Sequence, residues 1–168
     1  MAVEKVDTLV VGAGQAGIAA SEHLSNHGIS HIVLERDRIA EKWRSARWDS
    51  LVANGPAWHD RFPSRDFDDP NYDAFISKEA VADYFVDYVE QIKAPVRCGV
   101  TVEHVQRMPD GGGFHIKTNA GDFEARHIIA ATGPFQNPAI PPLVPADAPV
   151  HHGDAKGPVL ARDGGGDI

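Results

Sequence analysis

The chain has 168 residues, enough for one domain with a sizeable core, and at 42 % hydrophobic and 24 % charged it falls among ordinary globular proteins. The formal net charge of −8 argues against a nucleic-acid partner, because a phosphate backbone requires a basic face. No apolar run approaches the roughly 20 residues of a membrane-spanning helix, and the first residues lack the layout of a signal peptide. The single cysteine cannot form an internal disulfide. A cytoplasmic protein without membrane contact is therefore expected.

A strand–helix–strand unit is predicted near the start of the chain. Residues 7–11 are apolar on both faces, as in a central parallel strand, and a helix is expected from Gln15 to His27, with Gly28 as its stop signal. A second strand at residues 31–34 completes a right-handed crossover. The helix is expected to bury four residues on one side: Ala16, Ala19, Ala20 and Leu24.

Periodicity fades between Glu35 and Asp73, a segment that contains Trp43, Trp48 and Trp58. A stretch of this length without regular structure is usually functional or disordered, and its three tryptophans argue against disorder. The tryptophans either belong to a site or fasten a long loop to the surface of the domain.

The second half of the chain predicts a helix followed by short strands. Ser77 is expected to cap a helix that runs to about Lys93 and buries Val81, Phe85, Tyr88 and Ile92. A strand at residues 96–98 should bury Cys98. Residues 100–108, 114–118 and 122–126 predict an antiparallel meander, and residues 127–131 a further strand that ends at a Thr-Gly-Pro turn. The domain is expected to cover residues 1–150, and residues 151–168 to be a divergent, poorly ordered tail.

Glycines 12, 14 and 17 form a G-x-G-x-x-G motif between the first strand and the first helix. Gly12 permits the tight turn, Gly14 lets a pyrophosphate approach the backbone, and Gly17 lets the helix pack against the strands. Helix N–H groups then bind the anion without a basic side chain. Glu35 follows Gly12 by 23 residues, near the roughly 20 expected of an acid that binds a ribose. Its carboxylate would repel a 2′-phosphate, which disfavours NADP and leaves NAD and FAD open.

Four stretches, GAGQAG, LERD, EKWRSARWDSL and IIAATGPFQNP, occur in the order found in class B flavoprotein monooxygenases. The chain from about Val6 to Val150 resembles the FAD-binding part of this family, which includes the flavin-containing and Baeyer–Villiger-type monooxygenases. The resemblance implies an α/β fold with a Rossmann-like parallel sheet and a three-stranded antiparallel meander. It also selects FAD over NAD.

The resemblance implies a set of site residues as well. The residues expected to hold FAD are Gly12, Gly14, Gln15, Ala16, Gly17, Glu35, Arg36, Lys42, Trp43, Val102, Thr132 and Gly133. The glycine loop would hold the pyrophosphate, Glu35 the adenosine ribose, and Arg36 would flank the adenine. Asn54 stands where the family keeps an asparagine near the reactive edge of the flavin, although Asn54-Gly55-Pro56 also fits simple turn chemistry. No metal site is expected, since His23 and His27 lack a third ligand.

Related enzymes continue with a second glycine motif for NADPH, and this sequence stops where that domain would begin. We therefore expect the FAD-binding domain of an NADPH-dependent monooxygenase-like oxidoreductase that acts on a small molecule, truncated before the NADPH domain and unable to complete the cycle alone. No general acid or base is identified. The sequence leaves open whether the chain is a natural short protein, a disrupted gene product or a fragment. It also leaves open whether the chain forms a homo-oligomer or binds a partner chain. The alternatives are a non-catalytic flavin- or nucleotide-binding module that needs a partner chain and an NAD-linked reductase.

Overall fold

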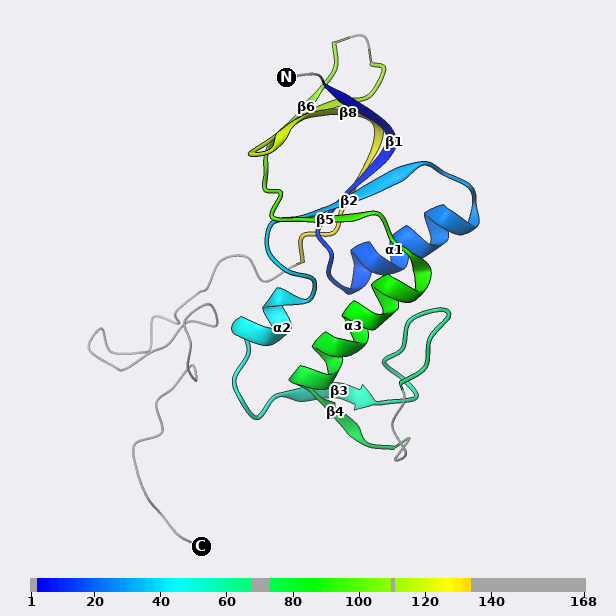
Figure 1. Ribbon diagram of the computed structural model, residues 1–168, viewed down its shortest axis with the longest axis vertical. Helices are drawn as coiled ribbons and strands as arrows, with labels where there is room; N and C mark the ends of the chain where they lie inside the picture. Colours follow the sequence, from blue (N-terminus) through cyan, green and yellow to red (C-terminus); the bar gives the residue numbers. More distant parts are fainter. Residues whose placement is uncertain (1–2, 68–72, 110, 134–168) are drawn as a thin grey trace, which may run out of the picture.

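A six-stranded sheet with helices on one side forms the frame of the computed structural model, which describes residues 3–67, 73–109 and 111–133 (Figure 1). Its strands are β1 (Glu4–Val11), β2 (His31–Glu35), β5 (Val96–Cys98), β6 (Val102–Arg107), β7 (Phe114–Thr118) and β8 (Gly121–Ala130), in the spatial order β5-β2-β1-β8-β7-β6. The first four strands of that order are parallel, and β7 and β6 continue the sheet antiparallel. The predicted parallel sheet and three-stranded meander are confirmed.

Strand β8 unites two strands that the sequence predicts separately. It runs through residues 121–130 without a break, pairing antiparallel with β7 from Gly121 to Ala125 and parallel with β1 from Phe123 to Ala130. Because β8 belongs to both pairings, the meander is a continuation of the main sheet that curls back over one of its faces (Figure 1).

Both faces of the central strands are buried. Successive strand residues point to opposite faces, so Val10 and Val33 pack on the helix side while Leu9, Ile32 and Leu34 pack against the meander. None of these five side chains is more than 3 % exposed. The continuous apolar runs in β1 and β2 follow from this burial on both faces.

Three helices lie on the other face of the sheet: α1 (Gln15–Asn26), α2 (Glu41–Ser45) and α3 (Lys78–Ile92) (Figure 1). Helix α3 begins as predicted, because Ser77 Oγ accepts a hydrogen bond from Ala80 N at 3.3 Å. It ends at Ile92, because the next residue, Lys93, has a φ of 50° and leaves the right-handed helical region. The predicted apolar positions of α3 are confirmed: Val81, Phe85 and Tyr88 are buried and Ile92 packs against the same core.

Two burial predictions are wrong. Ala16 is exposed, because it lies in the first turn of α1 at the open edge of the sheet, and Ala19, Ala20 and Leu24 are only half-buried. The buried residues of α1 are instead Gly17, Ile18, Ser21 and Glu22. Cys98 is also exposed, since β5 is a three-residue strand at the end of the sheet with a neighbour on one side only.

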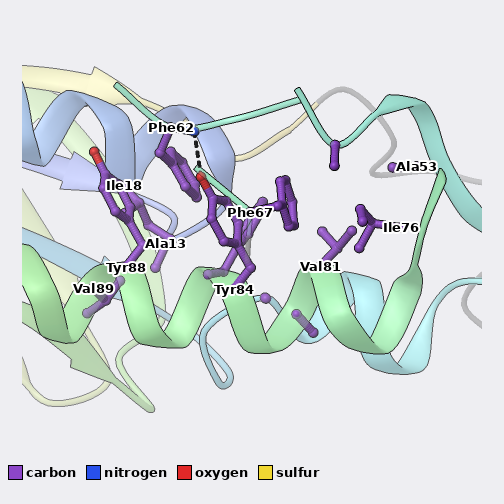
Figure 2. Packing of buried hydrophobic residues seen from close by; sticks show 14 of the residues in the cluster. Ala13, Ile18, Ala53, Phe62, Phe67, Ile76, Val81, Tyr84, Tyr88 and Val89 are labelled. Atoms are coloured by element: carbon purple, nitrogen blue, oxygen red, sulfur yellow. Dashed lines mark hydrogen bonds between the residues drawn. The ribbon is translucent and has the colours of Figure 1, made fainter. Parts of the chain in front are cut away.

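The segment without periodicity is held in place mainly by phenylalanine side chains. It supplies α2 and β3 (Val52–Pro56), and β3 pairs with β4 (Phe75–Ser77) in a separate two-stranded sheet. Phe62 and Phe67 are buried against α3 (Figure 2). Of the tryptophans only Trp43 packs inward, whereas Trp48 and Trp58 are 48 % and 45 % exposed.

No helix in the described part of the chain combines the length and apolar character needed to cross a bilayer. The predicted tail at residues 151–168 and the end of the predicted domain lie outside the described residues.

Candidate functional site

The glycine loop lies where β1 ends and α1 begins, at the carboxyl edge of the parallel strands. Gly12 N donates a hydrogen bond to Leu34 O at 2.8 Å, and Ala131 N donates one to Val11 O at 2.9 Å. The loop is therefore held between the end of β2 and the residue that follows β8. Ligands of open α/β sheets bind at this edge.

Gly12 and Gly17 are required by the packing of the protein on itself. Gly12 has a φ of +105°, and a Cβ built there would lie 2.6 Å from Ala131 O. A Cβ at Gly17 would lie 1.9 Å from Gly12 O. Both distances are shorter than any real contact of a Cβ atom, so neither position accepts a side chain without movement of the backbone.

Gly14 has a different role. Its φ of −86° suits any residue, and a Cβ built there meets no atom within 4 Å. The next two residues, Gln15 and Ala16, are exposed, and no side chain of the described residues caps the N-terminus of α1. Open space therefore lies before the free N–H groups and the positive end of the helix dipole. These properties fit a pyrophosphate, as the sequence predicts.

Glu35 joins the glycine loop to the end of β2. Its Oε2 accepts a hydrogen bond from Ala13 N at 2.8 Å, and its Oε1 accepts one from Asp37 N at 2.9 Å. A carboxylate has about four acceptor positions, so two remain for ribose hydroxyls. The sequence predicts the ribose contact but not the bond to Ala13, because nothing local indicates which loop a distant carboxylate will meet.

Other predicted adenine-side residues lie around Glu35. Val100 N donates to Glu35 O at 2.9 Å, which brings the start of β6 and half-buried Val102 to this edge. Arg36 is exposed, with its Nε 3.1 Å from Asp37 Oδ2. Cys98 pairs with Glu35 in the β2–β5 register. Desolvation and the Glu35 carboxylate raise the pKa of the Cys98 thiol, which therefore stays protonated at neutral pH.

The structure also brings the end of β8 to the glycine loop. The Cα of Thr132 lies 3.5 Å from the Cβ position built at Gly12, and Gly133 follows it. Lys42 and Trp43 lie on α2, both half-buried, and the Arg47 guanidinium carbon is 5.6 Å from the centre of the Trp43 ring.

Strand β3, which carries Asn54, lies away from the start of α1 and beside the start of α3 (Figure 1). Asn54 itself is exposed. A hydrogen-bonded pair that the sequence does not predict lies next to it. Asp60 Oδ2 accepts from Gly55 N at 2.9 Å, and Asp60 Oδ1 lies 2.8 Å from His59 Nδ1. Because a carboxylate only accepts, Nδ1 carries the proton and Nε2 of the neutral ring is free to accept another. The pair is a candidate proton acceptor.

No metal centre is found: the described residues contain no group of three or more His, Cys, Asp or Glu side chains that could hold an ion. His23, on α1, and His27, which follows α1 as its C-cap, are both exposed.

Comparisons with known proteins find a matching family model and similar sequences. A family model described as pyridine nucleotide-disulphide oxidoreductase matches residues 9–160. An uncharacterized CzcO-like oxidoreductase of Geobacillus kaustophilus (strain HTA426) is 38 % identical over 140 residues, which make up 82 % of this chain and 39 % of that relative. The indole-3-pyruvate monooxygenase YUCCA1 of Oryza sativa subsp. japonica is 30 % identical over 135 residues, or 79 % of this chain and 33 % of that protein.

A solved structure is also similar. The flavin-containing monooxygenase from Stenotrophomonas maltophilia superposes with a TM-score of 0.73 and 25 % identity, over 83 % of this chain and 42 % of that one. The chain thus spans about a third to two fifths of the length of these relatives.

Proposed function

The chain belongs to the pyridine nucleotide-disulphide oxidoreductase family, and on that premise we propose that it is the FAD-binding part of a flavoprotein monooxygenase-type oxidoreductase. The open space over Gly14, before the uncapped start of α1, is the observation that carries the proposal. The names of two relatives support it, since one is a flavin-containing monooxygenase and another an indole-3-pyruvate monooxygenase. A cytoplasmic location belongs to the proposal and rests on composition alone.

In this proposal the predicted residues divide between the two ends of the cofactor. The glycine loop, with Gln15 and Ala16, holds the pyrophosphate through main-chain N–H groups. The two unused acceptor positions of Glu35 bind the ribose hydroxyls and disfavour a 2′-phosphate, so NADPH is not assigned to this edge. Arg36 and Val102 are assigned to the adenine side of the cofactor, and Lys42 and Trp43 to the flavin side. Thr132 and Gly133, which lie beside the glycine loop, are assigned to the turn that closes over the cofactor.

The flavin, when bound, supplies the redox chemistry, and the residues of this chain position it and limit access of water. Asn54 and the His59–Asp60 pair are proposed to serve the reactive side. Asp60 holds the His59 ring with Nε2 free, so His59 can accept a proton at that atom and return it.

The proposal is tested by titrating the purified chain with FAD, using flavin fluorescence and calorimetry. We expect saturable binding. Gly14→Val should stay folded, because its Cβ enters open space, but should weaken binding at least about ten-fold by occupying the pyrophosphate position. Ser25→Val, an exposed change near the other end of α1, is the matched control and should bind like the parent. Glu35→Gln should lose about ten-fold in affinity.

Two outcomes contradict the proposal. Equal FAD affinity of Gly14→Val and the parent would remove the pyrophosphate from this loop. Tight binding of NADH without binding of FAD would favour an NAD-linked reductase instead.

A further inference from the structure

The two oxygens of the Glu35 carboxylate bind two different segments of main chain. Oε2 accepts a hydrogen bond from Ala13 N at 2.8 Å, and Oε1 accepts one from Asp37 N at 2.9 Å. Ala13 lies 22 positions away from Glu35 in the sequence, whereas Asp37 is a local partner two positions away. The Glu35 side chain therefore joins the distant glycine loop to the turn that follows β2.

Ala13 has a main-chain N–H whose partner is a side chain. The residue before it is fixed by the main chain of β2, to which Gly12 N donates at 2.8 Å. The residue after it is fixed by α1, because Gly14 O accepts from Ile18 N at 3.0 Å. Ala13 itself is 1 % exposed, and a buried N–H group requires a partner. The Glu35 carboxylate supplies that partner.

The bond to Glu35 affects what the glycine loop can bind. Gly14 follows Ala13 directly, and a Cβ built at Gly14 meets no atom within 4 Å. The first turn of α1 comes next, and its N–H groups have no intrahelical partner. Because Ala13 links β1 to this turn, a rotation of its peptide would move these N–H groups relative to the open space. A fixed Ala13 therefore keeps the anion-binding groups in place before a ligand arrives.

The charge of Glu35 has the opposite effect on an anion. A carboxylate repels a nearby anion, so Glu35 would weaken anion binding if charge were its only contribution. A contact with ribose hydroxyls cannot affect an anion that has no ribose. An anion without a ribose therefore separates the effect of Glu35 on loop shape from its effects through charge and through the ribose.

We propose that Glu35 is a positioning residue for the anion at the glycine loop, and that it acts through the main-chain N–H of Ala13. This role is additional to the ribose contact and does not require it. The place of the anion rests on the proposed function, whereas the bond between Glu35 and Ala13 is present without any ligand.

Asp37 supplies a matched control. Its carboxylate carries the same charge as that of Glu35, its side chain is 49 % exposed, and its Oδ2 lies 3.1 Å from Arg36 Nε. The described residues show no hydrogen bond between this carboxylate and the glycine loop. Glu35 accepts from the main chain of Asp37, so Asp37→Asn removes a charge near the loop and leaves both bonds of Glu35 in place.

Glu35→Asp is the test variant, because it keeps the negative charge but shortens the side chain by one methylene group. An aspartate side chain readily accepts a hydrogen bond from the main-chain N–H two residues later. The local bond to Asp37 should therefore survive, while the distant bond to Ala13 is lost. A change in the affinity for an anion without a ribose then results from neither charge nor ribose.

The experiment measures amide hydrogen exchange of the ligand-free chain by NMR and then titrates the chain with inorganic pyrophosphate, which has no ribose. In the parent, the Ala13 amide should exchange as slowly as the Gly12 amide, within about ten-fold. In Glu35→Asp, Ala13 should exchange at least about ten-fold faster relative to Gly12, and the affinity for pyrophosphate should fall about ten-fold. In Asp37→Asn, both quantities should stay within about two-fold of the parent. Circular dichroism checks that each variant is folded.

Three results would overturn the proposal. The first is free exchange of the Ala13 amide in the ligand-free parent, which does not depend on whether a variant folds. The second is an unchanged affinity for pyrophosphate in folded Glu35→Asp, and the third is an equal loss in Asp37→Asn. A parent that binds no pyrophosphate would instead contradict the anion site of the proposed function, and the exchange of Ala13 would still decide whether Glu35 fixes the loop.

Discussion

The glycine loop and the stacked rings of Phe67, Tyr84, Phe62 and Tyr88 lie on the same side of the sheet. The two regions have opposite packing requirements. The loop requires glycine at two positions, because a Cβ at Gly12 or Gly17 would lie 2.6 or 1.9 Å from a main-chain oxygen. The stack requires large side chains, because its rings fill the space between α3 and the chain that precedes it. An added methyl group should therefore damage the loop, whereas a removed ring should damage the stack.

The difference extends to what each region offers a ligand. The loop presents main-chain N–H groups and open space at Gly14, and such groups can bind an anion without a basic side chain. The stack is closed to ligands, since Tyr88 is fully buried and its hydroxyl donates a hydrogen bond to the buried Glu22. A loop with open space before it and a closed aromatic core thus lie side by side in one small domain.

The largest effect is expected from Phe62→Ala, which breaks the stack at its centre. Phe62 is 3 % exposed and contacts three aromatic residues of α3, so the variant leaves a cavity and should lose about 3–5 kcal/mol of unfolding free energy. Phe75→Ala removes a ring that is 56 % exposed and should change stability by about 0.5 kcal/mol or less. Urea unfolding measures both, and equal losses would show that the stack is not a core.

A smaller loss is expected from the addition of one methyl group to the loop. Gly17→Ala places a Cβ 1.9 Å from Gly12 O and should destabilise the domain by about 3 kcal/mol as the loop and α1 separate. Gly14→Ala is the same change three residues earlier, and since its Cβ meets no atom within 4 Å it should lose about 1 kcal/mol or less, mainly at the helix cap. Similar melting temperatures for the two variants would contradict the packing role of Gly17.

The smallest expected effect is a change in how the unfolding free energy depends on pH, which should involve the stack and not the loop. Because desolvation and Glu22 raise the pKa of Tyr88 in the folded state, the unfolded chain releases the phenol proton first as the pH rises. The stabilisation is complete below a pH of about 10 and declines above it, by about 1 kcal/mol between pH 9 and 11. Tyr88→Phe should flatten this decline in urea titrations, whereas Gly14→Ala should leave it unchanged. An identical alkaline slope in Tyr88→Phe and the parent would show that Tyr88 does not titrate differently in the two states.

Much of the fold follows from the sequence alone. The contact of Gly17 with Gly12, the Ser77 cap, and the helical recurrence of Val81, Phe85 and Tyr88 all involve residues a few positions apart. Such interactions depend on local backbone geometry, which a short pattern of residue types records directly. The position of the glycine loop between β1 and α1 is therefore predictable from the sequence.

Only the tertiary structure decided the contacts between distant segments. The bond between Tyr88 and Glu22 joins residues 66 positions apart, and that between Glu35 and Ala13 joins residues 22 apart. The exposure of Ala16 and Cys98 likewise depends on which element covers each position, not on the residue itself. The physical reason is that packing angles between helices and sheet result from the summed contacts of many side chains, and no short stretch of sequence contains that sum.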